Sequence, residues 1–288
     1  MTKSYSFYPG CALHASAREY DVSTLLVCRA LGIEITELAK WTCCGASSAH
    51  SFDTWLGLAL PALDLQEAEK AGRPLVIACA KCYSQLKMAS HEMQNRETLD
   101  NVNHLTGGVL KNTTEVVHLL QVLNLDSPDF TGTVKRPLKD LKVACYYGCL
   151  LVRPKDVAGF DDLEDPQIMD DIVRKLGAES VDWGLKTECC GASLMVTNRD
   201  VVMNLSHRLL RQAKQKGADC VAVACPLCHS NLDCYQKDIE KVYHDGSSLP
   251  VLYITQLMGL ALGFTPKEML MDRHLTDPLP LLRSKGLA

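Results

Sequence analysis

Short apolar runs alternate with longer amphipathic segments along the chain, and this alternation predicts strands separated by helices. Ser4–Tyr8 and Lys142–Tyr146 are typical of short strands, and residues 74–78 and 220–224 of buried strands. The intervening segments are predicted to be helical. Strands that alternate with helices favour βαβ units and a mainly parallel sheet.

Two segments show the apolar stripe of an amphipathic helix most plainly. Each stripe ends at a glycine, the residue that most often closes a helix in the left-handed conformation. The two stripes are Ile168, Met169, Ile172, Val173 and Leu176 before Gly177, and Val202, Leu205, Leu209 and Ala213 before Gly217.

The longest apolar stretch, residues 251–264, is predicted to be a core helix that closes the second half, with part of its surface open to a partner protein. It is shorter than the roughly 20 residues that a helix needs to cross a bilayer, so we expect no membrane span. The tail, residues 265–288, lacks regular periodicity, and we expect it to dock on a partner.

The chain also repeats itself. Cys43-Cys44-Gly45-Ala46-Ser47 recurs as Cys189-Cys190-Gly191-Ala192-Ser193, and a CxxC follows each copy at the same spacing. Upstream, Tyr8-Pro9-Gly10-Cys11 corresponds to Tyr147-Gly148-Cys149. The second half has eight more residues between its first cysteine and its CCG, which we assign to the acidic stretch 161–165.

Residues 124–140 hold Pro128, Gly132 and Pro137 without periodic apolar positions, which is typical of a linker. We therefore predict an α/β protein of two pseudo-symmetric repeats, each a small, mainly parallel sheet with flanking helices. The first domain is expected over residues 1–136, and the second, with the C-terminal tail, over residues 137–288.

Composition narrows the function. The first ten residues have no apolar core of a signal peptide, so we expect the chain to stay in the reducing cytoplasm. A formal net charge of −4 argues against non-specific nucleic-acid binding and favours small molecules and protein partners. The chain is also too long and too aliphatic for its 14 cysteines to form a small secreted disulfide scaffold.

The repeated cysteines suit a site with several metal atoms. A CxxC at a helix start lets two sulfurs converge where free backbone N–H groups stabilise thiolates. Adjacent cysteines diverge, and so reach two irons more easily than one small ion. Five cysteines in each half are one more than zinc or an ordinary four-iron cluster needs. The predicted ligands are Cys11, Cys43, Cys44, Cys79 and Cys82, and Cys149, Cys189, Cys190, Cys225 and Cys228.

Other interpretations use fewer of these residues. A structural zinc site would use four thiolates, and a thioredoxin-like dithiol only the CxxC pairs, but neither explains a duplicated CC. Of the unrepeated cysteines, Cys145 is a possible substitute ligand, whereas Cys28, Cys220 and Cys234 are expected to pack. The histidines near the cysteines are candidates either for hydrogen bonds to sulfur or for structural roles; they are His14, His50 and His229.

With its motifs matched twice between Tyr5 and Phe264, the sequence resembles the cysteine-rich CCG domain in its tandem form, as in the B subunit of heterodisulfide reductase. Similarity extends to Tyr147-Gly148-Cys149-Leu150-Leu151-Val152-Arg153-Pro154, where the family commonly has histidine in place of Leu150, and to Pro250-Val251-Leu252-Tyr253-Ile254-Thr255-Gln256-Leu257.

This resemblance implies that each set of five cysteines holds a non-cubane [4Fe-4S] cluster. It also implies a cleft between the halves, where a disulfide is split and each sulfur is captured by one cluster. Electrons would arrive through a ferredoxin-like iron–sulfur C subunit from a flavin-containing A subunit. The substrate would be a small thiol or disulfide, or a sulfur carrier.

Lys81, Arg153 and Lys155 each lie within a few residues of one of these cysteines, and we hypothesise that one or more of them helps to hold an anionic substrate. The alternative for each is a solvated surface charge. A competing hypothesis is a non-catalytic electron-transfer subunit, since similar CCG domains accompany dehydrogenases. Complete ligand sets in both halves favour catalysis.

Overall fold

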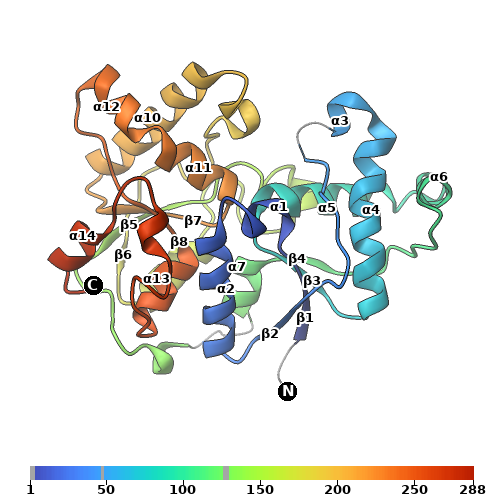
Figure 1. Cartoon of the computed structure of the whole chain (residues 1–288), viewed down its shortest axis with the longest axis horizontal. Helices are drawn as coiled ribbons and strands as arrows, with labels where there is room; N and C mark the ends of the chain where they lie inside the picture. The colour runs from blue at the N-terminus through green and yellow to red at the C-terminus, as the bar shows by residue number, and fades with distance from the viewer. Residues whose placement is uncertain (1–3, 47–48, 126–129) are drawn as a thin grey trace.

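The computed structural model describes residues 4–46, 49–125 and 130–288, which form two four-stranded sheets, one in each half (Figure 1). Every strand pair in both sheets is parallel. The predicted α/β fold of two similar repeats is therefore confirmed. The first sheet has the order β2-β1-β3-β4, with β1 Ser4–Tyr8, β2 Glu34–Glu37, β3 Leu75–Ile77 and β4 Val116–His118. The second has the order β6-β5-β7-β8, with β5 Lys142–Tyr146, β6 Glu179–Ser180, β7 Cys220–Val223 and β8 Val251–Tyr253.

Helices follow the strands in both halves. In the first they are α1 Gly10–His14, α2 Arg18–Ala30, α3 Ala49–Phe52, α4 Thr54–Ala71, α5 Ala80–Glu92, α6 Arg96–Thr106 and α7 Leu119–Leu125, followed by the 3-10 turn η1 Thr131–Thr133. In the second they are α8 Lys155–Ala158, α9 Ile168–Lys175, α10 Arg199–Gln215, α11 Pro226–Cys234, α12 Gln236–Tyr243, α13 Ile254–Ala261 and α14 Leu279–Ser284, with 3-10 turns η2 Ala192–Met195 and η3 Met271–Arg273. No helix in the described ranges combines the length and apolar composition needed to cross a lipid bilayer.

The two amphipathic stripes form the predicted helices α9 and α10. Gly177 adopts a φ of 84° and Gly217 the same value, so both close their helices in the left-handed conformation that glycine adopts without strain. The short strands β2, β4 and β6 were not predicted, because two to four residues carry too little periodicity to identify a strand.

The prediction of a helix over residues 251–264 is wrong for its first three residues. Val251–Tyr253 pairs with β7 as edge strand β8, and α13 begins only at Ile254. A short buried apolar run has no periodicity that separates a strand from a helix. The expected linker 124–140 is also partly wrong, since α7 reaches Leu125 and η1 covers Thr131–Thr133; its residues 126–129 lie outside the described part. The domain boundary near Pro137 stays a prediction.

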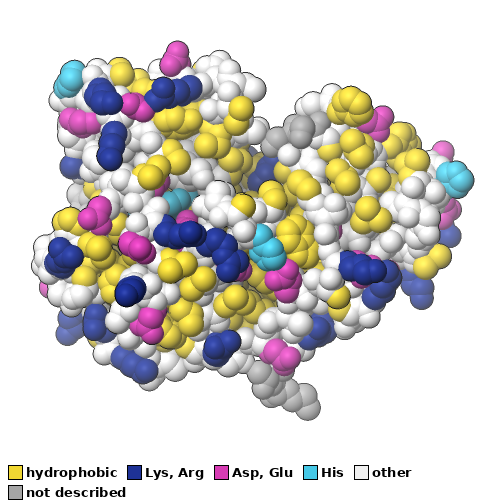
Figure 2. Space-filling model, in the orientation of Figure 1, with side chains coloured by type: hydrophobic (Ala, Val, Ile, Leu, Met, Phe, Trp, Pro, Cys, Tyr) yellow, Lys and Arg dark blue, Asp and Glu magenta, His cyan; other side chains and the backbone are white. Residues whose placement is uncertain are grey.

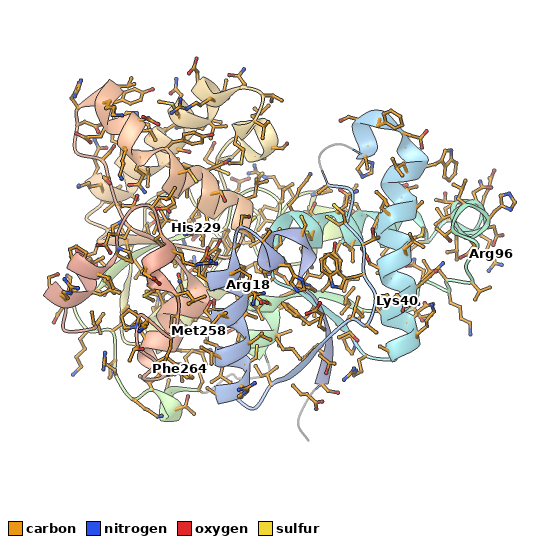
Figure 3. The ribbon with its side chains drawn as sticks, in the orientation of Figure 1. Arg18, Lys40, Arg96, His229, Met258 and Phe264 are labelled. Carbon is orange, nitrogen blue, oxygen red and sulfur yellow. The ribbon has the colours of Figure 1, made fainter. Side chains whose placement is uncertain are left out.

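The two halves pack through α2 and α13, which lie side by side (Figure 1). In Figure 3, Arg18 lies on α2 and Met258 on the neighbouring α13. The Ser23 and Thr255 hydroxyls are buried between the helices at 2.6 Å. Nearby, the rings of Tyr20 and Tyr253 stack at 4.1 Å. Together these contacts hold the two sheets in a defined relation.

The C-terminal tail packs on its own chain, and these contacts alone account for its conformation. Docking of the tail on a partner stays a prediction. Asp233 on α11 accepts the backbone N–H groups of Leu275 and Thr276 at 2.7 and 2.9 Å. Leu282 and Leu287 are buried in the core. The sequence of the tail is aperiodic and gave no indication of this packing, because the packing depends on contacts to a helix that is distant in sequence.

Candidate metal centre

The carboxyl ends of the central strands place the first cysteine and the CxxC of each repeat. Strand β1 leads to Gly10 and Cys11, and β3 leads to Cys79; β5 and β7 do the same in the second half. In a parallel sheet, the carboxyl ends of neighbouring strands share one edge. The topology therefore gathers cysteines that are far apart in sequence.

In the first half, the adjacent cysteines of CCG turn to different partners. The Cys43 thiol hydrogen-bonds with Cys11. The Cys44 sulfur lies 3.3 Å from that of Cys82, which also contacts Cys79. The five thiols thus form two hydrogen-bonded groups, Cys11 with Cys43 and Cys82 with Cys44 and Cys79, which the adjacent residues Cys43 and Cys44 bring together. Cys11 and Cys43 are exposed and the other three are buried.

The second half repeats this arrangement. Cys149 hydrogen-bonds with Cys189, and Cys190 with Cys228, which in turn contacts Cys225. Cys189 is exposed, whereas Cys190 and Cys225 are buried. We call these groups the first and second cysteine sets; their members are the ten cysteines predicted from the sequence.

The two sets meet at equivalent residues of the two repeats. Cys79 and Cys225, the first cysteines of the two CxxC motifs, hydrogen-bond with each other. They are the N-cap residues of α5 and α11, so both helix N-termini face the same buried region. The positive ends of the helix dipoles favour negative charge there.

Some of the thiols are arranged to ionise. A hydrogen bond from Cys82 lowers the pKa of Cys44 to about 7, against the effect of burial. A hydrogen bond from Cys149 likewise lowers the pKa of Cys189 to about 6. Because the thiolate is the form that binds metal, Cys44 and Cys189 suit metal binding near neutral pH.

A tyrosine supports each CCG turn, a role that the sequence interpretation missed. The Tyr8 hydroxyl donates to the Thr42 carbonyl at 2.7 Å, and the Tyr146 hydroxyl to the Glu188 carbonyl at 2.7 Å. Both also hydrogen-bond to the second cysteine of CC. The structural counterpart of Tyr8 is therefore Tyr146 rather than Tyr147. Counting back three residues from each first cysteine identifies this pair.

His118 links the backbones that precede the two CxxC motifs. Its Nε2 atom lies 3.1 Å from the Ala78 carbonyl and also bonds to that of Ala224. Because Nδ1 accepts from the Leu120 N–H group, Nε2 carries the proton. Burial lowers the His118 pKa to about 4, so the ring is neutral at physiological pH. His118 therefore positions both CxxC motifs without charge.

The glycine before each first cysteine lies against a set. A Cβ atom on Gly148 would be 3.1 Å from the Cys228 sulfur, and one on Gly10 would be 3.2 Å from the Cys82 sulfur. Both glycines have a φ of 67°. Only glycine combines this conformation with the close approach.

Gly148→Ala is expected to destabilise the protein more than Gly246→Ala. Gly246 has a φ of 63° with nothing within 4 Å of its Cβ position, so its replacement costs only the left-handed conformation, about 1 kcal/mol. Gly148→Ala also displaces the Cys228 sulfur, so metal retention should fall with it. Thermal unfolding and metal content of both variants check this; equal losses would show that the sulfur contact is unimportant.

Asp64 is a buried acid beside the first set. One carboxylate oxygen accepts the Thr42 N–H group at 2.7 Å, and the other has no hydrogen-bond partner among the described residues. Burial raises the Asp64 pKa to about 8, and the negative charge of Cys44 adds to the shift. The carboxyl group is therefore mostly protonated in the folded protein at neutral pH.

This raised pKa predicts the pH dependence of stability. Between about pH 4 and pH 8 the unfolded chain releases the Asp64 proton while the folded chain keeps it, so this group reduces stability as pH rises. The melting temperature of metal-free Asp64→Asn, relative to wild type, should increase from pH 5 to pH 8. Asp100→Asn, an exposed control, should show no such trend; an equal trend in both would contradict the prediction.

Behind the second set lies a buried ion pair. Lys186 Nζ is 3.1 Å from an Asp170 oxygen, and both side chains are buried. Asp170 also accepts hydrogen bonds from Tyr147 and Ser180, each at 2.6 Å. The Lys186 carbonyl accepts the N–H groups of Tyr147 and Gly148, so the network supports the backbone beside Cys149.

The expected substrate residues lie outside the sets. Lys81 on α5 lowers the pKa of Cys44 electrostatically, after stronger hydrogen-bond effects. Arg153 pairs with Glu164 at 2.8 Å on the surface, and Lys155 is exposed. The extra acidic stretch, residues 161–165, lies between α8 and α9. It supplies Glu164, the partner of Arg153.

The remaining candidates have other partners. Cys145 is fully buried, 3.8 Å from the Ser180 hydroxyl, so it packs in the core. His14 pairs with Glu37 at 3.3 Å. His229 lies on α11 (Figure 3), where it stacks on Tyr253 and contacts His274 at 2.9 Å. His50 contacts Gln85.

The other cysteines outside the sets are Cys28 and Cys220, both buried, and Cys234, which is exposed.

The chemistry of the two sets fits a thiolate-bound metal centre. Each set supplies five sulfur atoms, with backbone N–H groups of the residues after CC directed at them. Thiolates select zinc or iron–sulfur clusters over metals that prefer oxygen ligands. Five ligands exceed a tetrahedral zinc site, and the separate partners of Cys43 and Cys44 suit more than one metal atom.

Fold and site together define a tandem-repeat α/β protein with two thiol-rich centres. Residues 5–87 and 143–233 each match the cysteine-rich domain named CCG. The chain belongs to this CCG family and carries two tandem copies of its domain, as the sequence motifs predicted.

Relatives of known name match over nearly full length. The chain is 35% identical to the 8-methylmenaquinol:fumarate reductase membrane anchor subunit of Wolinella succinogenes, covering 98% of this chain and 100% of that protein. It is 31% identical to the B subunit of the ferredoxin/F420H2-dependent CoB-CoM heterodisulfide reductase of Methanosarcina acetivorans, covering 96% and 95%.

A solved structure shares the fold. A hypothetical protein from Helicobacter pylori superposes with a TM-score of 0.77 at 17% identity, covering 96% of this chain. The chain spans 52% of that protein's length. At this identity the likeness extends to the fold alone.

Proposed function

We propose that this protein is the catalytic iron–sulfur subunit of a heterodisulfide-reductase-like complex. Each cysteine set would hold one [4Fe-4S] cluster, of the non-cubane type that uses five ligands. The observation that carries the proposal is that two complete sets meet at Cys79 and Cys225. Two similar centres side by side suit a reaction that divides two electrons between two sulfur atoms.

When bound, the clusters would supply one electron each and an iron site for each released thiolate. The overall reaction converts one disulfide, two electrons and two protons into two thiols, or runs in reverse. The chain's own groups then have two tasks. Backbone N–H groups and the tyrosine hydroxyls stabilise the ligand thiolates, and the exposed Cys11, Cys43 and Cys189 mark where a small substrate reaches the sets.

The surface is hollowed between the lobe of α10–α12 and the lobe of α3–α4, with hydrophobic side chains on both walls (Figure 2). A small pocket at the second set includes Leu150 and Leu227 beside the cysteines, with Ala80 from the first half. Its lining is mostly apolar, and its volume of about 10 Å³ leaves it closed to a substrate in this conformation. Lys81, Arg153 and Lys155 would hold an anionic group of the substrate.

Electrons would reach the protein through a ferredoxin-like iron–sulfur C subunit from a flavin-containing A subunit, in the cytoplasm. The resemblance to the B subunit of heterodisulfide reductase supports these partners. Replacing Lys81, Arg153 and Lys155 singly by alanine and measuring substrate affinity tests the binding assignment; unchanged affinity in all three would exclude it.

The cofactor is tested by purifying the protein without oxygen. We expect about eight iron and eight acid-labile sulfide per chain if both sets hold four-iron clusters. Zinc alone would contradict the proposal. An EPR signal that appears when a thiol is added under oxidising conditions would show that substrate binds at a cluster.

A second candidate is an electron-transfer subunit that docks a dehydrogenase at a membrane surface. Two observations favour it: the name of the Wolinella relative, and apolar side chains exposed after each CCG motif. Phe52 is 86% exposed and Val196 87%, with Trp55 and Leu56 also exposed. Aromatic and aliphatic side chains of this kind bind the lipid interface.

Flotation with anionic phospholipid vesicles separates the candidates. Membrane docking predicts that the wild type floats and that Phe52→Asp with Trp55→Asp abolishes flotation. Val109→Asp is the matched control, since Val109 is 88% exposed after α6, away from the CCG motifs. A wild-type protein that stays in solution while showing the thiol-dependent EPR signal supports the catalytic role.

A further inference from the structure

The side-chain amide of Asn231 contacts the second cysteine set. It is fully buried on α11, and its Nδ2 atom lies 3.4 Å from the Cys190 sulfur. The same nitrogen donates to the carbonyls of Cys190 and Ala192 at 3.1 and 3.0 Å. The two N–H groups of Asn231 are shared among these three acceptors, so the amide holds the CCG turn and contributes a shared hydrogen bond to the Cys190 sulfur.

The first set does not share this contact. From Cys43 to Gln85, each position of the first repeat precedes its counterpart by 146 residues, so Gln85 on α5 corresponds to Asn231. The Gln85 amide instead donates to the Gly57 carbonyl at 3.3 Å and contacts His50. Within the described part of the chain, no side-chain amide hydrogen-bonds to the Cys44 sulfur.

The other donors are matched between the sets. Tyr8 and Tyr146 serve Cys44 and Cys190 alike. The backbone N–H groups of Ala46 and Ala192 do the same. The amide of Asn231 is thus an addition to an otherwise repeated pattern of hydrogen bonds.

A second difference acts in the same direction. Asp64 interacts unfavourably with Cys44 when both are charged, whereas the corresponding residue in the second repeat is the buried Leu210. Lys81 acts in the opposite direction at Cys44, and its counterpart in the second repeat is Leu227. The difference that remains between the two sets is therefore the Asn231 amide at Cys190.

We propose that Asn231 makes the metal centre of the second cysteine set the first to accept an electron. The inference rests on the proposed function, in which each set holds a cluster. A hydrogen bond to a ligand sulfur withdraws electron density and stabilises the reduced state, which raises the reduction potential. Asn231 acts through Cys190, so it is a positioning residue and not a catalytic one.

The test is a reductive titration of the anaerobic protein with dithionite, followed by EPR. The wild type should show two reduction steps at different potentials. Asn231→Leu, which has a similar volume and no donor, should lower the potential of the earlier step and leave the other in place. Gln85→Leu, the matched control, should shift neither step in this way.

A further variant keeps the inference open to refutation. If Asn231→Leu loses its second centre, Asn231→Gln retains an amide at the position where the first repeat already has glutamine, and should shift the earlier step less. An earlier step that stays unmoved in both variants, or two steps that move equally, would overturn the inference.

A readout without iron separates this inference from the proposed function. Cobalt(II) bound to the thiolates gives a sulfur-to-metal charge-transfer band whose energy responds to hydrogen bonds on sulfur. In iron-free protein, Asn231→Leu should shift the band of one site and Gln85→Leu the band of neither. Wild-type protein without iron would refute the clusters, whereas an unshifted cobalt band would refute the role of Asn231.

Discussion

Cys82→Ser and Cys228→Ser should each remove about half of the bound iron, and the double variant nearly all of it. Each of these sulfurs joins its own set together: Cys82 contacts Cys44 and Cys79, and Cys228 contacts Cys190 and Cys225. Loss of such a ligand prevents assembly of that centre, because the thiolates are the sole protein groups that the sets offer. Iron and sulfide analysis of anaerobically purified variants measures the effect.

The controls are Cys28→Ala and Cys220→Ala. Both cysteines are buried outside the sets, and burial raises the pKa of each thiol to about 12, so they remain protonated. These variants should keep the full iron content. If Cys82→Ser alone removed all the iron, the contact between Cys79 and Cys225 would belong to one shared centre, and the two-centre interpretation would be wrong.

Asp170→Ala should have the largest effect on folding, lowering the free energy of unfolding by about 3–5 kcal/mol. The variant leaves buried Lys186 with only the exposed Asp165 as an acidic partner, and it removes the acceptor for Tyr147 and Ser180. A buried charge that loses its buried partner is costly, because the exposed Asp165 compensates it only in part. Denaturant unfolding of the metal-free protein measures the loss.

The comparison is the exposed pair of Arg96 and Asp100, 3.1 Å apart on α6. Asp100→Ala should cost at most about 1 kcal/mol, because water already solvates both charges. In addition, Asp170→Ala should reduce iron in the second set before the first, since Lys186 supports the backbone at Gly148. Similar destabilisation by the two variants would show that the buried network is unimportant.

Most of the fold was predictable because its signals are local. The amphipathic stripes of α9 and α10 end at Gly177 and Gly217 in the sequence as in the structure. Apolar runs before the cysteines predicted β1, β3, β5 and β7 within a residue at each end. The prediction missed strand β8. A short apolar run next to a buried helix has the same sequence pattern whether it forms a strand or the first turn of the helix.

The two cysteine sets were predictable for a different reason. The duplicated CCG and CxxC motifs place glycine and thiols at fixed spacings in the sequence. They can therefore be recognised without knowledge of the three-dimensional structure. The supporting residues carry no such signal. Asn231, Asp64, His118 and Asp170 are ordinary polar residues in sequence, and their importance depends on what burial places beside them.

The two repeats, the parallel strand–helix alternation and the positions of the ten repeated cysteines can all be inferred from the amino-acid sequence, because each follows from neighbouring residues or from repetition. Three relations required the folded chain: the contact of Cys79 with Cys225, the contact of Asn231 rather than Gln85 with a sulfur of its own set, and the position of Asp64 beside Cys44. These relations join residues from separate strands and helices, so they exist only once the sheets have formed and packed. Local patterns specify what each segment becomes, whereas packing specifies which side chains share a buried environment and therefore what charge they can hold.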